Sequence, residues 1–463
     1  MPGLMLSLFM AAMDATIVGT ALPTIARELG SFALYPWIIA GYLVTATVTA
    51  PVWGRLADVR GRRSVLLTGI AIFIVASALC AASPAMQWLI AFRTLQGIGA
   101  GCIQPLVFTI LGDTFPLEQR ARLQGFFSSM WAIAAIIGPV FGALFVSTIG
   151  WRWIFTVNVP IGFVAIGLIW SYRERALEED RGHAIDVRGA GLLTVGVVLL
   201  LIGLGTGSQT ATPIWSLVVM SVVVIAAFVQ VERRSANPTV PLGLLRQRVI
   251  GPAVLIASLA GTLMFGVTAY VPLWVQSVQG ASAYAAGIVL GAMSIGWAIM
   301  STTAGFLMTR VGYERLVVGG SLALLAGSLM LAAGPPSLGV MWTGAATFVI
   351  GIGMGTFSAP LLIVIQSNVE WAQRGAATAL NQFSRTIGGA VGVALMGVVL
   401  QRYVAPIDVP LNAGERLRAG MATDFRILVV LAICVFSAAV AIFLFSRRRR
   451  AADVPADAQL PAD

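Results

Sequence analysis

The chain has 463 residues, of which 58% are apolar and only 10% are charged. A soluble globular protein carries about 25% charged residues, so this composition excludes an ordinary water-soluble fold. The formal net charge is +10, but every basic residue is arginine and most lie in short segments between apolar runs. This pattern favours orientation in a membrane over binding of a nucleic acid.

Apolar runs of about 20 residues follow one another along the chain, and each is long enough to cross the hydrocarbon core of a bilayer as a helix. Barrel-type alternation is absent, and backbone amides cannot remain unpaired in lipid, so we predict helices. No positive charge precedes the first run, which indicates a membrane span rather than a cleaved signal. We predict fourteen spans, at residues 3–26, 34–54, 64–82, 87–112, 123–149, 153–172, 187–205, 213–231, 251–278, 284–309, 316–333, 340–366, 376–403 and 425–445.

The arginines predict the orientation of these spans. With both termini in the cytoplasm, most arginines fall on the cytoplasmic side, as the positive-inside rule requires for an even number of spans. The arginines left outside are Arg27, Arg152, Arg402, Arg416, Arg418 and Arg426. We therefore expect a multi-pass protein of a bacterial inner (cytoplasmic) membrane; arginine without lysine, together with abundant alanine, indicates a GC-rich bacterial genome.

The chain also contains an internal repeat. The segment 54–61 returns in part as 305–312, and the glycine pattern of 97–101 returns at 351–355. Duplicated halves around a shared site are typical of secondary transporters. We predict an all-α protein with an N-terminal six-helix bundle (1–175), an inserted helix pair with cytoplasmic linkers (176–248), a C-terminal six-helix bundle (249–446) and a basic, then disordered, cytoplasmic tail (447–463).

Five stretches resemble motifs of the major facilitator superfamily, and specifically its fourteen-span drug/proton antiporter group. They are 14–18 with 21–23, 54–63, Arg93 with 96–99, 138–142, and 151–155 with Asn158, Pro160 and Gly162. The resemblance covers nearly the whole chain, and it implies the major facilitator fold and alternating access driven by protons. The family's fifth-span motif has a further glycine where this chain has Ala143.

Asp14 lies near the middle of the first predicted span, where a charge is costly, so it either faces a polar cavity or is protonated much of the time. Either state suits a proton carrier, although a carboxyl that only cross-links helices is the alternative. Arg93 cannot lose its charge and needs a partner or water. The resemblance implies that it couples protonation to conformational change, with Asp14 as the obvious partner; an arginine that extends to the outer interface is the alternative.

Two further motifs carry expectations about gating. The loop after the second span contains Gly54, Asp58, Arg60, Gly61 and Arg62, and the resemblance implies a latch that holds the cytoplasmic side shut. The alternative is that the arginines of this loop only mark the cytoplasmic side of the membrane, as the positive-inside rule predicts. In the fifth span, Gly138, Pro139 and Gly142 allow close packing and a bend. Such packing would seal a leak path in an exchanger.

Polar, aromatic and methionine side chains on the spans that line the family's cavity are candidates for binding the cargo. They are Met13, Gln104, Trp131, Met264, Tyr270, Asn381, Gln382 and Arg385. Such residues also commonly face lipid or neighbouring helices.

We therefore predict a proton-coupled antiporter that exports lipophilic or amphiphilic small molecules. An exporter of an endogenous lipid, siderophore or metabolite is the alternative within the same fold. An intramembrane enzyme is the alternative from a different class, but the spans contain no HExxH motif, no GxSxG motif and no intramembrane His/Cys/Asp cluster. We expect no cofactor and no metal. We expect a monomer whose partners are protons, a small-molecule substrate and the lipid bilayer, and no nucleic acid. A periplasmic adaptor protein is a further partner that the sequence leaves open.

Overall fold

A computed structural model describes residues 1–30, 32–114, 117–170, 187–205, 214–235, 242–370, 373–404 and 413–452. Every regular element in these residues is helical, which confirms the predicted all-α class. The longer helices are α1 (Pro2–Leu29), α2 (Trp37–Arg60), α3 (Arg62–Ala81), α4 (Met86–Thr114), α5 (Leu117–Thr148), α7 (Asn158–Trp170), α8 (Val187–Gly205), α9 (Ile214–Glu232), α11 (Ile250–Leu273), α12 (Ala283–Val311), α13 (Tyr313–Ala333), α14 (Gly339–Ser367), α15 (Arg374–Val404) and α16 (Ala413–Ala452). Short elements are η1 (Phe32–Leu34), α6 (Trp153–Thr156), α10 (Leu242–Leu245), η2 (Trp274–Val278) and η3 (Pro336–Leu338).

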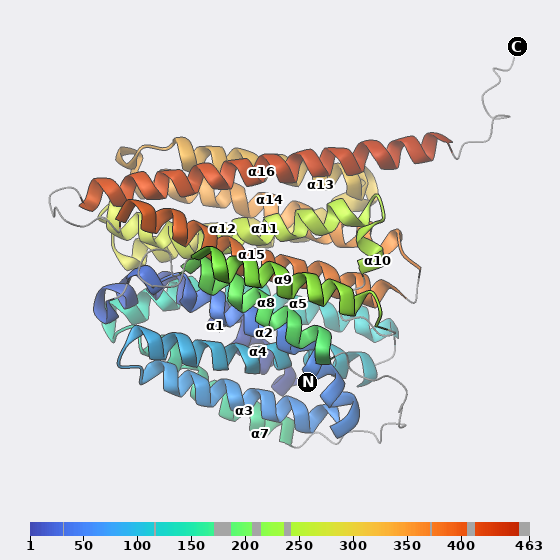
Figure 1. The fold of residues 1–463 in the computed structure, drawn as a ribbon, viewed down its shortest axis with the longest axis horizontal. Coiled ribbons are helices and arrows are strands. Elements are labelled where there is room, and N and C mark those ends of the chain that lie inside the picture. Colours follow the sequence, from blue (N-terminus) through green and yellow to red (C-terminus); the bar gives the residue numbers. More distant parts are fainter. Residues whose placement is uncertain are drawn as a thin grey trace, which may run out of the picture.

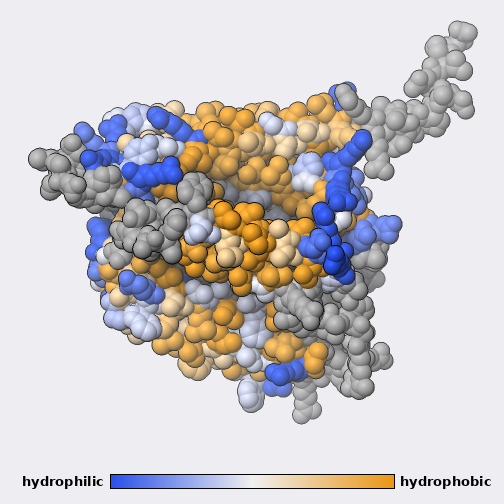
Figure 2. All heavy atoms as spheres, viewed as in Figure 1, coloured by the Kyte–Doolittle hydropathy of each residue, from blue (hydrophilic) through white to orange (hydrophobic). Residues whose placement is uncertain are grey.

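Eleven helices of the described residues are long and apolar enough to cross a membrane. Three shorter apolar stretches, Ile133–Thr148, Gly191–Leu200 and Ser216–Glu232, belong to α5, α8 and α9. The predicted count of fourteen spans is therefore not confirmed. Figure 2 shows an apolar band along the helices with hydrophilic residues gathered toward their two ends.

One predicted boundary is wrong. The last predicted span began at residue 425, whereas α16 begins at Ala413, and the apolar part that can cross a membrane runs over Gly414–Arg447. The earlier start places Asp424 within α16, where its side chain is fully buried.

The helices of the first half, α1 to α7, and of the second half, α11 to α16, pack in the same pattern. In the first half α1 packs on α5 and α7, and α4 packs on α2 and α3. In the second half α11 packs on α15 and α16, and α14 packs on α12 and α13. The pair α8 and α9 lies between the halves, where α8 touches both α2 and α15 (Figure 1). The repeat found in the sequence therefore corresponds to a repeated arrangement of helices, while the exact domain boundaries stay a prediction.

The repeated glycines of α4 and α14 explain why these helices pack so closely on two neighbours. A Cβ atom on Gly99 would lie 2.7 Å from both the Gly69 carbonyl oxygen and the Phe73 amide nitrogen of α3. A Cβ atom on Gly353, its counterpart in the repeat, would lie 2.7 Å from the Leu324 amide nitrogen of α13. Glycine lets helix backbones touch, so the same spacing gives the same contact in both halves.

The turn between the second and third helices also differs from the expected loop. Residues 54–60 continue α2, and only Gly61, with φ of 89°, separates α2 from α3. Gly312, with φ of 86°, makes the same turn between α12 and α13. A positive φ is accessible to glycine at little cost, which accounts for glycine at both sites. A Cβ atom on Gly54 would meet open space, so no close approach occurs there.

The two halves touch where α1 ends and α2 begins, which we call the α1–α2 end of the bundle. Gln276 donates to the Thr20 carbonyl oxygen at 3.2 Å, and Arg27 donates to the Gln276 side chain at 3.1 Å. The Tyr35 hydroxyl donates to the Ala269 carbonyl oxygen at 2.5 Å. These bonds hold α1 and the following turn against the second half.

The glycine contacts predict which substitutions the packing tolerates. We expect Gly99→Leu to lower the melting temperature of the purified protein in detergent, because backbone atoms of α3 cannot move aside as a flexible side chain would. Gly167→Leu is the matched control, since a Cβ atom on this exposed glycine of α7 meets nothing within 4 Å. Equal melting temperatures for the two variants would contradict the packing role of Gly99.

Candidate functional site

The candidate site is a group of polar side chains inside the first half. Asp14 of α1 is fully buried, and Arg93 of α4 is 2% exposed. The Arg93 Nη1 atom lies 2.7 Å from Asp14 Oδ2. Asp14 Oδ1 accepts hydrogen bonds from Gln96 Nε2 at 2.9 Å and from Asn158 Nδ2 at 2.8 Å. Three donors from two other helices therefore surround one carboxylate.

Ser77 of α3 extends this group to a fourth helix. Its Oγ atom accepts from Gln96 Nε2 at 2.7 Å and from Asn158 Nδ2 at 3.4 Å. Gln96 in turn accepts from Arg93 Nη1 at 2.6 Å. We refer to Asp14, Ser77, Arg93, Gln96 and Asn158 as the Asp14 network. It joins α1, α3, α4 and α7, and each member is almost completely buried.

Aromatic rings complete the surroundings of Arg93. Its guanidinium lies over the Tyr42 ring, 4.2 Å from the centroid, and 5.7 Å from the centroid of the Phe155 ring. Its Nε atom donates to the Ile38 carbonyl oxygen at 3.4 Å. A planar cation that stacks on aromatic faces while it binds a carboxylate is the arrangement in which arginine differs most from lysine. The burial also excludes the alternative that Arg93 extends to the outer interface.

The local sequence explains part of this geometry. Arg93 and Gln96 are three residues apart on α4, so their side chains lie on one face of that helix. Asn158 is the first residue of α7, directly after the break at Val157. At that position its side chain reaches into the bundle at the depth of Asp14.

The surroundings of Asp14 are polar. Arg93, Gln96 and Asn158 donate hydrogen bonds to its two carboxylate oxygens, and the expectation that this carboxyl carries protons stays a prediction. Taking away the cation or adding a proton leaves one partner of a buried pair uncompensated, which is strongly unfavourable. The network therefore cross-links four helices through a buried charge pair.

The fifth-span glycines hold α5 against α1, as predicted from close packing. A Cβ atom on Gly138 would lie 3.2 Å from the Ile17 amide nitrogen, and one on Gly142 would lie 2.6 Å from the Ile17 carbonyl oxygen. On the other side of α5, a Cβ atom on Gly287 of α12 would lie 2.7 Å from the Pro139 carbonyl oxygen. Helix α5 thus fills the space between α1 and the second half. Whether it seals a leak path stays a prediction.

The predicted cytoplasmic latch is only partly visible. Arg60 is exposed at the end of α2, Gly61 makes the turn, and Arg62 is half-buried at the start of α3. The side chain of Asp58, the central residue of the expected latch, lies outside the described residues. The latch therefore remains a prediction.

The predicted cavity residues of the first half are not gathered in one place. Met13 is 4% exposed and packs with Ala12 and Ala134 between α1 and α5. Gln104 is half-buried and is not among the side chains bonded in the Asp14 network. The side chain of Trp131 lies outside the described residues.

In the second half, Arg385 of α15 is half-buried and donates to Gln382 Oε1 at 2.7 Å. Asn381 and Met264 are also half-buried. Tyr270 of α11 is fully buried, and its hydroxyl donates to the Val393 carbonyl oxygen at 2.7 Å. Of these residues only Gln382 and Arg385 are joined directly to one another.

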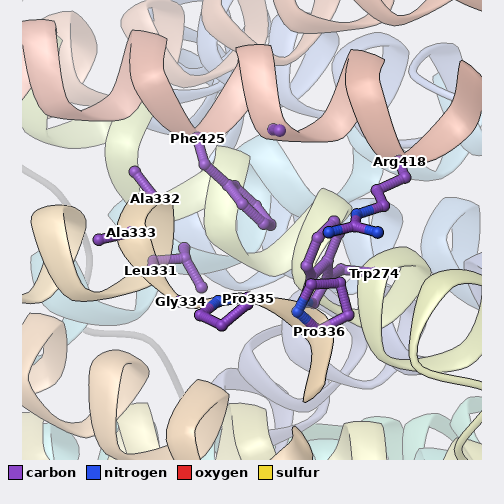
Figure 3. Close-up of a pocket in the computed structure, with 10 residues that line it drawn as sticks. Trp274, Leu331, Ala332, Ala333, Gly334, Pro335, Pro336, Arg418 and Phe425 are labelled. Atoms are coloured by element: carbon purple, nitrogen blue, oxygen red, sulfur yellow. The ribbon is translucent and has the colours of Figure 1, made fainter. Parts of the chain in front are cut away.

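The second half contains a cavity of about 140 Å³. Figure 3 shows residues that line it, with Arg418 of α16 extending toward Trp274. Ligand pockets for drug-sized molecules measure about 300–1,000 Å³, so this cavity is too small to hold such a cargo. It is lined by residues of the second half alone and has no part in the Asp14 network.

Three residues were missed or left without a role in the sequence. Gln96 and Asn158 stood in the recognised motifs without an assigned function, although a polar amide in an apolar span is a signal for a buried hydrogen-bond partner. Ser77 gave no usable signal, because a serine can satisfy its hydroxyl on its own helix, as it also does here by donating to the Phe73 carbonyl oxygen.

Residues 4–393 match the model of the Major Facilitator Superfamily. The chain belongs to this superfamily. Its family and fold are those of transporters, so the protein is a multi-pass membrane transporter and not an enzyme. The alternative of an intramembrane enzyme is thereby excluded.

Relatives and solved structures agree with this assignment. The chain is 34% identical over 401 residues to Multidrug resistance protein 3 of Bacillus subtilis (strain 168), covering 86% of this chain and 78% of the relative. It is 34% identical over 403 residues to Multidrug transporter protein MdtP of the same strain, covering 86% and 74%. A bacterial homologue of the human lysosomal transporter Spinster has the same fold, with a TM-score of 0.68, 16% identity and 96% of each chain covered.

The Asp14–Arg93 pair predicts a non-additive pattern of stability. We expect Arg93→Gln to destabilise the protein by about 3–5 kcal/mol, because it leaves a buried carboxylate without a cation. Adding Asp14→Asn should recover part of this loss, since the neutral amide has no charge to compensate. Thermal unfolding in detergent of both single variants and the double variant tests this expectation, and additive losses would rule out the coupling.

Proposed function

We propose that this transporter is a proton-coupled antiporter that exports lipophilic or amphiphilic small molecules by alternating access. The observation that carries the proposal is the Asp14 network, a buried acid–arginine pair in the centre of the first half. The names of its relatives, two of which are multidrug proteins, supply the class of cargo. Proton coupling and antiport go beyond what the names of the relatives say, and they are argued below from the Asp14 network.

The energetic argument for proton coupling starts from Arg93. A proton on Asp14 would remove the negative charge that compensates the buried guanidinium, and arginine cannot respond by losing its own proton. The protonated state therefore favours an arrangement of helices in which Arg93 gains another partner or water. A single proton can in this way shift the balance between two arrangements of the first half.

Helix α1 provides a route from this pair to the other half. Asp14 lies in the middle of α1, and Thr20, six residues further along the same helix, accepts a hydrogen bond from Gln276 of the second half. Between them, a Cβ atom on Gly19 would lie 2.9 Å from the Thr268 carbonyl oxygen. A small shift of α1 that accompanies protonation would therefore act directly on the contact between the halves.

The remaining parts of the proposal concern topology. We include α5, α8 and α9 among fourteen spans, place both termini in the cytoplasm of a bacterial inner membrane, and retain the domain bounds predicted above. On this topology the α1–α2 end faces outward, so the hydrogen bonds there belong to a state that is closed to the outside. We also retain the latch at the cytoplasmic end and the cavity residues of both halves as expectations.

Transport in proteoliposomes with an imposed pH gradient tests the proposal, with ethidium as the probe. We expect the wild type to move ethidium when the gradient is present, and Asp14→Asn to lose this gradient-driven transport while it still inserts and folds. The control is Glu28→Gln, because Glu28 is a half-exposed acid near the end of α1 that contacts Arg152 at 3.7 Å. The control variant should transport at the wild-type rate.

Two outcomes would contradict parts of this proposal. Full gradient-driven transport by Asp14→Asn would reduce Asp14 to a structural cross-link between helices. Absence of ethidium transport by the wild type, together with transport of a lipid or siderophore under the same gradient, would favour the alternative cargo and leave proton coupling intact.

A further inference from the structure

The second half contains a buried acid that the proposed function does not use. Asp424 of α16 is fully buried, and neither of its carboxylate oxygens has a hydrogen-bond partner among the described residues. Buried carboxyl groups in proteins are normally hydrogen-bonded or paired with a cation. Asp14 meets this requirement with three donors, and Asp424 does not meet it at all.

The repeated arrangement of the two halves allows the surroundings of the two buried acids to be compared position by position. At the offset that relates Gly97 to Gly351, Arg93 corresponds to Thr347 of α14. The Thr347 hydroxyl donates to the Val289 carbonyl oxygen at 2.8 Å, so α14 offers no cation where α4 offers one. Helix α16 takes the place of α7 in the repeated packing, which puts an acid on the helix that corresponds to the one carrying Asn158. The second half therefore has a buried acid without the arginine.

The groups around Asp424 do not replace that cation. Tyr270 lies on α11, which packs against α16, but its hydroxyl is already bonded to the Val393 carbonyl oxygen. On α15, Tyr403 is bonded to Thr423, the residue before Asp424. On α13, Glu314 and Arg315 lie in the first turn, whereas the opposite end of α13 lines the cavity with α16. The remaining charged groups on α16 near Asp424 are Glu415, Arg416, Arg418 and Arg426. None of the three arginines donates a hydrogen bond to either carboxylate oxygen of Asp424.

Asp424 lies on the part of α16 that packs beside the α1–α2 end. The ring of the next residue, Phe425, lies 5.3 Å from that of Trp274 between centroids, and Trp274 is two residues before Gln276, which bonds to Thr20. The rings of Tyr270 and Tyr35 are 6.0 Å apart between centroids, and Tyr35 belongs to the first half. The Tyr35 hydroxyl donates to Ala269, the neighbour of Tyr270. Separation of the halves at this end would withdraw Tyr35 and open the side of Tyr270 to water. The cavity of Figure 3 offers no such route, because its residues Arg418, Ala422 and Phe425 lie on another face of α16.

We infer that Asp424 is a second protonation site of this transporter, whose proton exchanges with water only when the α1–α2 end opens. In the closed state the carboxyl keeps its proton, because an unpaired anion in this environment is strongly disfavoured. When the end opens, the O–H bond of the carboxyl breaks and the proton passes to water, and the reverse step takes a proton from water. This inference rests on alternating access, which is part of the proposed function, but it does not depend on the identity of the cargo.

Infrared difference spectroscopy on vesicle-reconstituted protein tests the inference without any cargo. A change of buffer pH should produce a carboxylic C=O band that Asp424→Asn removes and that both Asp14→Asn and the control Glu28→Gln retain. A spectrum unchanged by Asp424→Asn would overturn the inference. Because Asp14 and Asp424 are removed separately, a failure of the proposed role of Asp14 is distinguishable from a failure of this one.

A reversible cross-link tests the dependence on opening. The Cβ atom of a residue at 397 would lie 3.0 Å from the Cβ of Pro36. A disulfide needs about 3.5–4.5 Å between Cβ atoms, so a small outward shift of the two backbones would bring a cysteine pair into range. In the variant Pro36→Cys/Gly397→Cys we expect oxidation to suppress the Asp424 band and reduction to restore it. Equal bands in the oxidised and reduced protein would overturn the dependence on opening.

Labelling of the wild type covers the case in which Asp424→Asn fails to fold. Dicyclohexylcarbodiimide reacts with protonated carboxyl groups in apolar surroundings, and peptide mass mapping locates the modified residue. We expect modification of Asp424 that decreases as the pH is raised. No modification of Asp424 at any pH would contradict the inference.

Discussion

A carboxylate that is fully buried between membrane helices has to be neutralised by the protein, because neither water nor lipid can do so. Asp14 meets this constraint with a cation from α4, an amide from α4 and an amide from α7. The four helices that contribute to the Asp14 network can satisfy it only at one depth and in one rotation. The arrangement of the first half is consequently tied to the charge of a single side chain.

Close backbone packing transmits this dependence to the rest of the molecule. Helix α5 lies against α1 through Gly138 and Gly142, and against α12 through Pro139. In the second half, Gly388 of α15 packs on α11 in the same manner, and Thr262 donates to its carbonyl oxygen at 2.7 Å. Because such interfaces have little free space, a displacement of α1 is passed on to its neighbours as a shift rather than absorbed by them.

The two halves are alike in packing but different in polar content. The glycine contacts of α4 return in α14, and the positive-φ turn at Gly61 returns at Gly312. Arg93 has no counterpart, since threonine occupies the equivalent position in α14. A duplicated scaffold with one compensated buried acid and one that has no partner among the described residues would give the two halves different responses to protons in the proposed antiporter.

The sequence alone determined that the chain is helical, that it crosses a membrane repeatedly, that it contains a repeat and to which superfamily it belongs. These properties depend on hydrophobic length and residue spacing, both of which are local. It also singled out Asp14 and Arg93, because a charge inside an apolar run is conspicuous. Only the tertiary structure decided that these two residues touch, that Ser77 and Asn158 join them, and that Asp424 lies inside a helix without a hydrogen-bond partner among the residues that the structure describes. The partner of a buried group depends on the relative depth and rotation of several helices, and these are fixed by packing between segments that lie far apart in the chain.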